Sequence, residues 1–257
     1  MPGLINVSIE ASYIGIDIAN VSIPQDIVES LKESSVTAKL ITGTGLESLP
    51  DNIEEIDLAV SVFGLEYSDL DCSLPKVYRA LTANGRLEAI LHHSGSIVCD
   101  MSKRALNEFC PEDFEATCEH LFVISRALDV ALHPSDLASN KKAEKARKKI
   151  NAMCDKYMRD TDLKTGNAFM FEQMAHALKF FRITNSSSGE RNTFIKNFRA
   201  QTLASRERHQ QMVSVAMDAS QVEKLQRKLM VLGFTKANFN TVSQSGEVLG
   251  WKISALK

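Results

Sequence analysis

The sequence predicts an α/β protein with a mostly parallel sheet, a terminal antiparallel hairpin and an α-helical insertion. Apolar runs alternate with helical patterns in the first third of the 257-residue chain, as in a parallel sheet with right-handed crossovers. From about Ser102 to Ala216, apolar residues recur at helical spacing without a convincing strand. Strand patterns return only at the carboxyl end. Together these observations predict a sheet interrupted by helices.

The amino-terminal segment contains the first two predicted strands. Tyr13–Ile18 is an apolar, strand-like run that includes an acidic residue. Pro24–Lys32 predicts a helix, because proline suits the first helical turn. Ala38–Thr42 predicts the next strand, which runs into the turn Gly43–Gly45.

Two further strands flank a second helix. Ile56–Phe63 is apolar on both faces, as a buried parallel strand requires. Leu74–Leu81 predicts a helix, and Asn84-Gly85 is expected to stop it. Arg86–His92 predicts the fourth strand.

The middle of the chain is predicted to be entirely helical. Phe171, Met174 and Leu178 illustrate the helical spacing of its apolar residues. Pro134 and Ser186–Gly189 interrupt this spacing. We therefore expect about four or five helices in this insertion.

The carboxyl-terminal segment predicts a helix followed by a hairpin. Ser220–Glu223 has the pattern of a capping box, and Gly233 suits the end of the helix that follows. Lys236–Val242 and Val248–Leu256 predict strands. The connection Ser243–Glu247 is too short for a parallel crossover, so these strands are expected to pair antiparallel.

Composition is that of an ordinary globular protein. Hydrophobic residues make up 44% and charged residues 24% of the chain, and the formal net charge of -2 gives no global attraction to nucleic acid or membrane. No apolar run reaches the ~18 residues of a membrane span, and no signal-peptide pattern opens the sequence. We therefore expect a cytoplasmic protein without a membrane partner.

The five cysteines are odd in number and form no CxxC pair, which argues against a disulfide framework or a zinc site. We expect buried or half-buried thiols and no metal ligands. A reactive nucleophile is disfavoured, because no cysteine is paired in sequence with a recognisable base. The cysteines are Cys72, Cys99, Cys110, Cys118 and Cys154.

Four ordered stretches carry a family resemblance: Tyr13–Ile18, Gly43–Pro50, Ile56–Tyr67 and Arg79–Leu87. They resemble the second-strand acid, the adenine loop, the fourth strand and the approach to the fifth strand of class I S-adenosylmethionine-dependent methyltransferases, of the bacterial type with a helical insertion. In that family the last strand is inserted antiparallel, whereas nicotinamide-binding Rossmann domains stay parallel. The predicted terminal hairpin therefore favours the methyltransferase family.

The resemblance implies a Rossmann-like methyltransferase sheet and three parts. Residues 1–100 would be a cofactor-binding part that is truncated at its amino end. Residues 101–217 would be a helical insertion or substrate cap. Residues 218–257 would complete the sheet with a helix and a β-hairpin.

The implied cofactor is S-adenosyl-L-methionine, and the implied partner is a small-molecule methyl acceptor. Asp17, followed by Ile18, would accept hydrogen bonds from both ribose hydroxyls, since an ionised carboxylate has two acceptor oxygens. Leu46 would lie against the adenine ring, with Glu47 beside it. The alternative for Asp17 is a structural cap at the end of a strand.

Further implied site residues lie near the carboxyl ends of the fourth and fifth strands, where ligands bind to such sheets. Ser61 and Phe63 would line the crevice near the methionine part of the cofactor. Phe63 and Tyr67 have the alternative of being core aromatics, and the His pair that of a structural hydrogen-bonding element. No catalytic residue is assigned. The implied substrate-side residues are Glu66, Tyr67, His92 and His93.

The sequence departs from the family at the amino end. The Gly-rich loop and the central strand that leads into it are not found, and Gly45 stands where an acidic residue often precedes Leu46. Pro2-Gly3 would be the last trace of the loop, with Leu4–Glu10 as the start of the following helix. Alternatively, Leu4–Ile9 fills part of the gap as a strand. Because each buried unpaired backbone group costs about 1–3 kcal/mol, we expect a truncated or degenerate member rather than a complete enzyme with a new loop.

Several functional alternatives stay open. The first is a small-molecule methyltransferase, and the second is a non-enzymatic interaction protein on the same scaffold. Asp17 also suits a dinucleotide ribose, so a nicotinamide-dependent oxidoreductase is a third. The basic run Lys141–Lys149 contains no aromatic residue for stacking on bases, which favours a solvated helix over a nucleic-acid site. The sequence leaves the methyl acceptor and the oligomeric state open.

Overall fold

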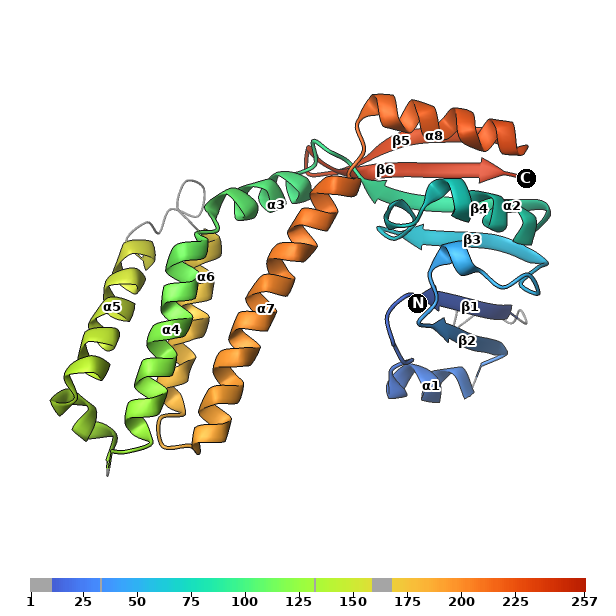
Figure 1. The fold of residues 1–257 in the computed structure, drawn as a ribbon. Helices are drawn as coiled ribbons and strands as arrows, with labels where there is room; N and C mark the ends of the chain where they lie inside the picture. The colour runs from blue at the N-terminus through green and yellow to red at the C-terminus, as the bar shows by residue number, and fades with distance from the viewer. Residues whose placement is uncertain (1–10, 33, 132, 159–167) are drawn as a thin grey trace. The chain divides into compact units, whose positions relative to one another are not determined.

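The computed structural model describes residues 11–32, 34–131, 133–158 and 168–257. The chain divides into two compact units (Figure 1). Met1–Ser96 and Val215–Lys257 form one, which we call the sheet unit, and Ile97–Ser214 form the other, the helical unit. The boundaries expected near residues 101 and 217 lie a few residues from this division. The segments Pro2-Gly3 and Leu4–Glu10 lie outside the described residues.

The sheet unit begins with a parallel pair of strands. β1 (Ala11–Asp17) pairs with β2 (Val36–Thr42), and α1 (Gln25–Lys32) connects them, so the predicted strand, helix and strand are confirmed. Ile14 and Ile16 project from β1 into a small cluster with Leu49, Ile53 and Ala80. This burial holds the pair against the rest of the sheet unit.

The second sheet of this unit has the strand order β3-β4-β6-β5. β3 (Ile56–Val62) and β4 (Leu81–His92) are parallel, while β6 (Glu247–Leu256) is antiparallel to both β4 and β5 (Thr235–Gln244). The predicted terminal hairpin is confirmed. The last strand therefore lies inside the sheet, and the hairpin's first strand lies at its edge.

The helix between β3 and β4 differs from the prediction. α2 (Leu70–Ala80) begins earlier than expected, and Leu81 already starts β4. Asn84 and Gly85 therefore do not stop the helix. They lie at an irregularity of β4, where Asn84 has φ 71° and the pairing with β3 changes register. A Cβ on Gly85 would lie 2.9 Å from the carbonyl oxygen of Ile56, so glycine permits this close approach.

The helix before the hairpin is α8 (Ala219–Leu232), and its amino-terminal cap also differs from the prediction. The side chain of Asp218 accepts the backbone N–H of Gln221, and the side chain of Gln221 accepts the N–H of Asp218. The capping box predicted at Ser220–Glu223 is therefore wrong, because Asp218 supplies the same chemistry two residues earlier. Gly233 ends the helix in the left-handed conformation at φ 104°, as predicted.

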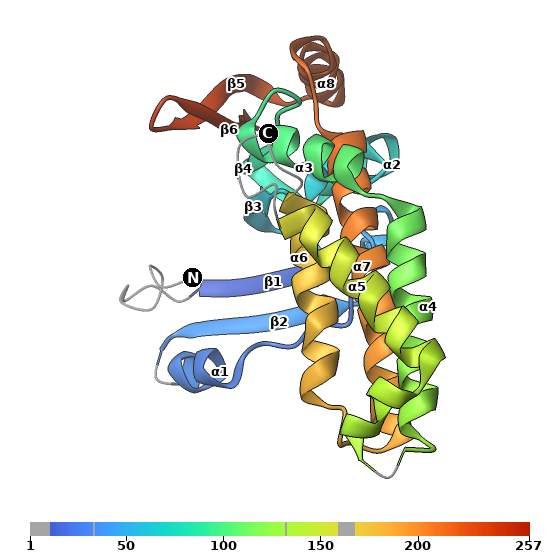
Figure 2. The ribbon, with the colours of Figure 1, turned by 90° about the vertical axis from the view of Figure 1, so that its left-hand side faces the viewer.

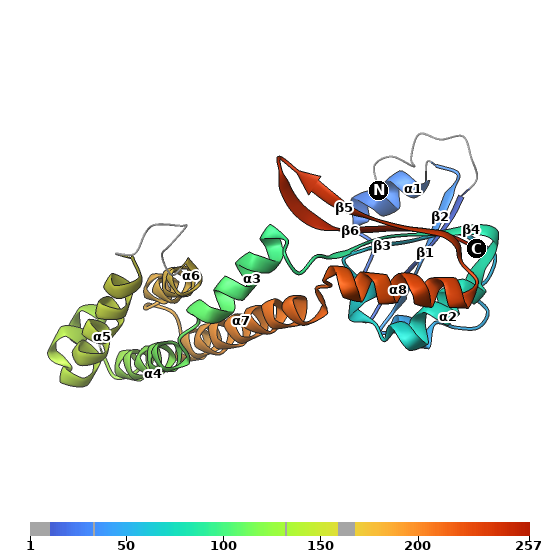
Figure 3. The ribbon, with the colours of Figure 1, turned by 90° about the horizontal axis from the view of Figure 1, so that it is seen from above.

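Helices α2 and α8 cover one face of the four-stranded sheet (Figure 3). The core beneath them includes Leu74 from α2, Leu91 from β4, Leu229 from α8 and Ile253 from β6, all fully buried. The alternation of strand residues places Leu91 and Ile253 on the face that the two helices cover. The prediction that β3 is buried on both faces is wrong, because three apolar side chains on its other face stay more than half exposed: Leu58, Val60 and Val62.

The helical unit contains five α-helices and two short 3₁₀ segments within its described residues, in agreement with the predicted insertion. Its core holds buried aromatic rings from three elements, Phe114, Phe180 and Phe198. Figure 2 shows the longer helices running along one another. The described elements of the helical unit are α3 (Ile97–Glu108), α4 (Pro111–Leu128), η3 (Pro134–Ser139), α5 (Lys141–Met158), α6 (Ala168–Ala177), η4 (Leu178–Arg182) and α7 (Ser188–Val215).

The five cysteines all lie in the described ranges, and none is joined to another in a disulfide. Cys99, Cys118 and Cys154 are buried and Cys110 is half-buried, as predicted, whereas Cys72 is exposed. Burial raises the pKa of the Cys118 thiol to about 11, which disfavours the nucleophilic thiolate. Of the helices in the described ranges, none combines the length and the apolar character needed to cross a bilayer.

Candidate functional site

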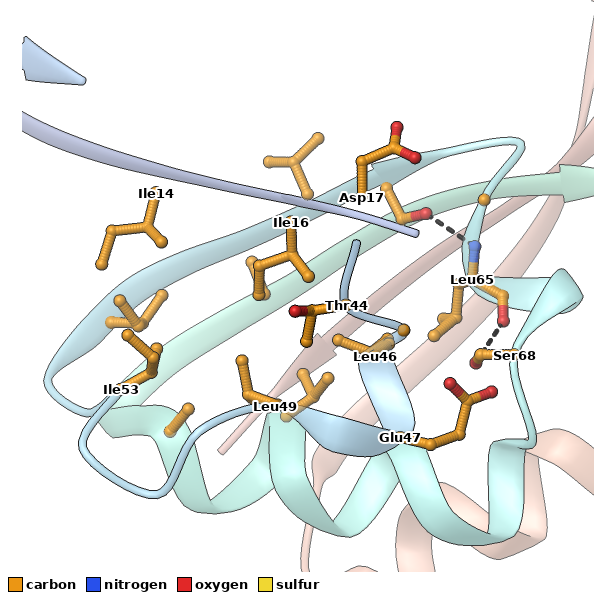
Figure 4. Close-up of a pocket in the computed structure, with 18 of the residues that line it drawn as sticks. Ile14, Ile16, Asp17, Thr44, Leu46, Glu47, Leu49, Ile53, Leu65 and Ser68 are labelled. Carbon is orange, nitrogen blue, oxygen red and sulfur yellow. Dashed lines mark hydrogen bonds between the residues drawn. The ribbon is translucent and has the colours of Figure 1, made fainter. Parts of the chain in front are cut away.

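A cavity of about 430 Å³ opens in the sheet unit between β1 and β3 (Figure 4). β1 contributes Ile14, Ile16 and Asp17 to its wall, and β3 contributes residues from Ile56 to Ser61. The rest of the wall comes from the segments that follow β1, β2 and β3, and from α2 and β4, which contribute Val77, Ala80, Leu81 and Leu87. β1 and β3 belong to separate sheets, and in the described part of the chain no ladder joins them.

The cavity has an apolar end and a polar end. Figure 4 shows Ile14 and Ile53 at one end, and Asp17, Leu65 and Ser68 toward the other. Asp17 is the last residue of β1, and Leu65 follows the end of β3. The polar end therefore lies at the carboxyl ends of both strands, which is where ligands bind in open α/β sheets.

Asp17 is exposed at this end of β1. Its Oδ1 accepts the backbone N–H of Ala19 at 2.8 Å, and its carbonyl oxygen accepts the N–H of Thr44 at 3.1 Å. The predicted capping role is thus present. The second carboxylate oxygen, Oδ2, has no hydrogen-bond partner among the described residues, so it is available to a ligand.

Leu46 and Glu47, which the resemblance would place in an adenine loop, belong to a 3₁₀ turn, η1 (Leu46–Ser48), and both line the cavity. Leu46 packs at the edge of the sheet core. The Glu47 side chain has a structural role. Its Oε1 accepts the backbone N–H of Asp69, the amino-terminal cap of α2, at 2.6 Å. Glu47 therefore fixes the position of this loop against α2.

The segment after β3 is held by two serines. Ser61 accepts the N–H of Leu65 through its Oγ at 2.8 Å, and Ser68 donates its hydroxyl to the carbonyl oxygen of Leu65 at 2.7 Å (Figure 4). Both serines line the cavity. Ser61 and Ile18, predicted from sequence, thus lie on the wall. Thr44 and Ser68 also line the cavity, but the sequence did not predict them, because a small polar residue in a turn gives no distinctive signal.

Glu66 and His92 form a buried pair that does not line the cavity. The Glu66 Oε1 atom accepts the backbone N–H of His92 at 2.9 Å and lies 2.6 Å from its Nδ1. The ring centroids of Phe63 and Tyr67 lie 4.5 and 5.8 Å from that of His92. Tyr67 also lines the cavity, and burial together with Glu66 raises the pKa of its hydroxyl.

His93 lies apart from this group. Its ring stacks on Trp251 at a centroid distance of 4.6 Å, and its Nδ1 accepts the N–H of Gly95 at 2.9 Å. Neither His93 nor Phe63 is among the residues that line the cavity. The structure therefore brings together Asp17, Ile18, Leu46, Glu47, Ser61 and Tyr67 on the wall, and it places Glu66 and His92 behind Tyr67.

Replacing Gly250 with alanine should destabilise the sheet unit by about 1–3 kcal/mol. Gly250 pairs with His92 across β6 and β4, and a Cβ there would lie 2.6 Å from the carbonyl oxygen of Leu91 and 3.2 Å from the Phe63 ring. Urea unfolding measures the change. The control is Gly189→Ala in α7, where the added Cβ would lie 3.8 Å from its nearest neighbouring atom. An unfolding midpoint of Gly250→Ala equal to that of the wild type would contradict the expected clash.

The site has the features of a small-molecule binding cavity. Its volume falls in the range of about 300–1,000 Å³ typical of ligand pockets, and few polar groups converge on a mostly apolar wall. Within the residues that the structure describes, no three His, Cys, Asp or Glu side chains are grouped to hold a metal ion. The fold and the cavity thus define an α/β protein with a candidate ligand site. Comparison with known proteins gives no matching family model and no significantly similar curated protein.

Proposed function

We propose that this protein is an S-adenosylmethionine-dependent methyltransferase that acts on a small molecule. The observation that carries the proposal is the position of the cavity at the carboxyl ends of β1 and β3. The free oxygen of Asp17 and the side chain of Leu46 lie on its wall, in the roles that the sequence resemblance implies for ribose and adenine.

The order of the strands also supports this proposal. β6 is the last strand of the chain and lies antiparallel between β4 and β5. An antiparallel last strand inserted into the sheet is typical of class I methyltransferases, whereas the sheet of a nicotinamide-binding domain stays parallel. This arrangement therefore favours a methyltransferase over an oxidoreductase.

The wall residues fit the adenosyl part of such a cofactor. Oδ2 of Asp17 can accept a hydrogen bond from a ribose hydroxyl, and Ile18 and Leu46 offer apolar contact to a purine. The oxygen of the Ser61 hydroxyl accepts the backbone N–H of Leu65, so its proton can still be donated to a ligand. When bound, the cofactor supplies an electrophilic methyl group on a sulfonium sulfur. The residues of this chain bind and orient the two reactants, which is the main requirement of methyl transfer.

An interaction protein is the second candidate function, and one observation favours it. Leu58, Val60 and Val62 leave 53%, 64% and 60% of their surface exposed on one face of β3, and of these three only Val60 also lines the cavity. Apolar side chains gathered on one strand are typical of a contact surface. The titration described next separates the two functions, because only the methyltransferase requires binding of the cofactor product.

Asp17→Asn should weaken binding of S-adenosylhomocysteine about 10–100-fold, because a hydrogen bond to a charged acceptor contributes about 1.5–3 kcal/mol. Isothermal titration of the purified protein measures the dissociation constant. Asp26→Asn is the matched control, since Asp26 lies in the first turn of α1 and does not line the cavity. Absence of binding by the wild-type protein would refute the proposed function. Equal affinities of wild type and Asp17→Asn would refute the role of Asp17.

A further inference from the structure

A basic hollow of about 550 Å³ lies on α5, in the helical unit. Figure 1 shows α5 as an outer helix of this unit. One wall residue, Ala138, comes from η3, and the others come from α5. They include one carboxylate, Glu144, and four lysines that we call the lysine face: Lys141, Lys145, Lys148 and Lys149.

The periodicity of α5 gathers these lysines on one side of the helix. With 3.6 residues per turn, positions 141, 145, 148 and 149 fall within about 100° of the helix circumference. The opposite side is the one that packs into the helical unit, and it includes the buried residues Ala143, Ala146 and Ile150. The positive charge of the run Lys141–Lys149 is therefore concentrated where α5 faces away from its core.

Most of this charge has no carboxylate partner. Glu144 receives two hydrogen bonds from Arg147, both at 2.8 Å, and lies 3.7 Å from Lys148. The other three members of the lysine face make no ion pair within the part of the chain that the structure describes. Lys156, further along α5, does have such a partner, since it contacts Asp113 at 2.7 Å.

The arrangement is unfavourable for the protein by itself. Lys145 lies four positions from both Lys141 and Lys149, a spacing at which like charges on a helix repel. Lys141 is also the first residue of α5, where the helix dipole disfavours a positive charge. A bound polyanion would remove both kinds of repulsion.

The wall of the hollow favours one class of polyanion. One helix and a single residue of η3 do not enclose a small ligand, so the hollow suits an extended chain of negative charges. The wall holds no aromatic side chain for stacking on unpaired bases and no large apolar side chain for insertion into a bilayer. A nucleic-acid duplex needs neither, because its bases stay stacked inside and its phosphates face outward.

We propose that the lysine face of α5 binds the phosphate backbone of double-stranded nucleic acid without reading its base sequence. From Lys141 to Lys149 the helix rises about 12 Å, at about 1.5 Å per residue. A duplex carries about seven phosphates over the same length of its axis, which is enough for four lysines. The inference does not depend on the proposed methyltransferase function, because it concerns the helical unit and not the cavity of the sheet unit.

Fluorescence anisotropy tests the inference with labelled DNA and RNA duplexes of about 20 base pairs, at salt concentrations from about 50 to 200 mM. We expect the logarithm of the association constant to fall linearly with the logarithm of the salt concentration. The double substitution Lys145→Gln and Lys149→Gln should weaken binding about 10–100-fold at about 100 mM salt, and it should make the slope for the DNA duplex shallower by about 2. Two duplexes of unrelated sequence should bind equally, because contacts to phosphates carry no sequence information.

The matched control is the double substitution Lys179→Gln and Lys196→Gln. It removes the same charge from two exposed lysines of the helical unit that do not line the hollow. We expect this variant to bind a duplex with the affinity and the salt dependence of the wild type. Circular dichroism verifies that both variants are folded.

Three results would overturn the inference. The first is that neither duplex binds at the lowest salt concentration. The second is equal affinity and salt dependence of the wild type and the Lys145 and Lys149 variant. The third is tighter binding of a single strand than of the duplex with the same sequence. Vesicles with anionic phospholipids are tested in parallel, and binding of vesicles without binding of either duplex would assign the lysine face to a membrane surface instead.

Discussion

Replacing Arg191 with methionine should lower the free energy of unfolding of the helical unit by about 3–5 kcal/mol. The substitution removes a buried guanidinium, and the oxygen atoms that it pairs with then lose their partner. Arg191 lies in the first turn of α7 and is only 5% exposed. Its Nη2 contacts Asp129 and the carbonyl oxygen of Ser125 at the end of α4. Its Nη1 donates to the carbonyl oxygens of Thr184 and Ser186. One side chain therefore joins the end of α4, the start of α7 and the turn between η4 and α7.

Arg199→Met is the matched control on the same helix. Arg199 pairs with Glu115 at 3.0 Å, but 54% and 43% of the two side chains are exposed. A surface ion pair of this kind contributes about 0–1 kcal/mol. Urea unfolding followed by circular dichroism compares the two variants. Equal losses would show that burial of Arg191 does not matter to the stability of the helical unit.

Replacing Leu229 with alanine should destabilise the sheet unit by about 2–5 kcal/mol, through lost apolar burial and the cavity that remains. Leu229 lies on α8 and is fully buried. It belongs to the same apolar cluster as Leu74 from α2, Leu91 from β4 and Ile253 from β6. The side chain thus helps to hold α8 against the sheet that ends at the candidate site.

Val231→Ala provides the comparison for this prediction. Val231 lies two residues further along α8 and is 87% exposed. We expect its replacement to change the free energy of unfolding by less than about 0.5 kcal/mol, because it loses no packing. Thermal unfolding of both variants distinguishes the cases. Similar midpoints would mean that α8 does not pack through the face that contains Leu229.

Most of the sheet unit could be predicted from local sequence. Tyr13–Ile18, Ala38–Thr42 and Ile56–Phe63 each carry a short apolar pattern that suits a buried strand, and the structure confirms a strand at each place. The five-residue connection before Val248 forces the antiparallel hairpin, because no parallel crossover is that short. These features depend on residues close together in the chain.

The candidate site could be predicted only in part. Asp17, Leu46, Ser61 and Tyr67 line one cavity because each lies at or shortly after the carboxyl end of a parallel strand, and the strand ends of the two sheets border the same cavity. The hydrogen bond from the Asp69 N–H to Glu47 could not be foreseen, since 22 positions separate the two residues. Whether a side chain lines the cavity or holds a loop in place depends on its hydrogen-bond partners, and sequence patterns do not reveal these partners.

The sequence by itself determined the kind and order of the elements, since local periodicity and turn chemistry set them. Only the tertiary structure decided where Asn84 and Gly85 act, because left-handed or glycine positions suit a helix end and a strand irregularity alike, and pairing with β3 selects the second. It also decided that Glu66 and His92 meet. Their contact spans 26 positions, and it exists because β3 and β4 are parallel neighbours whose carboxyl ends coincide.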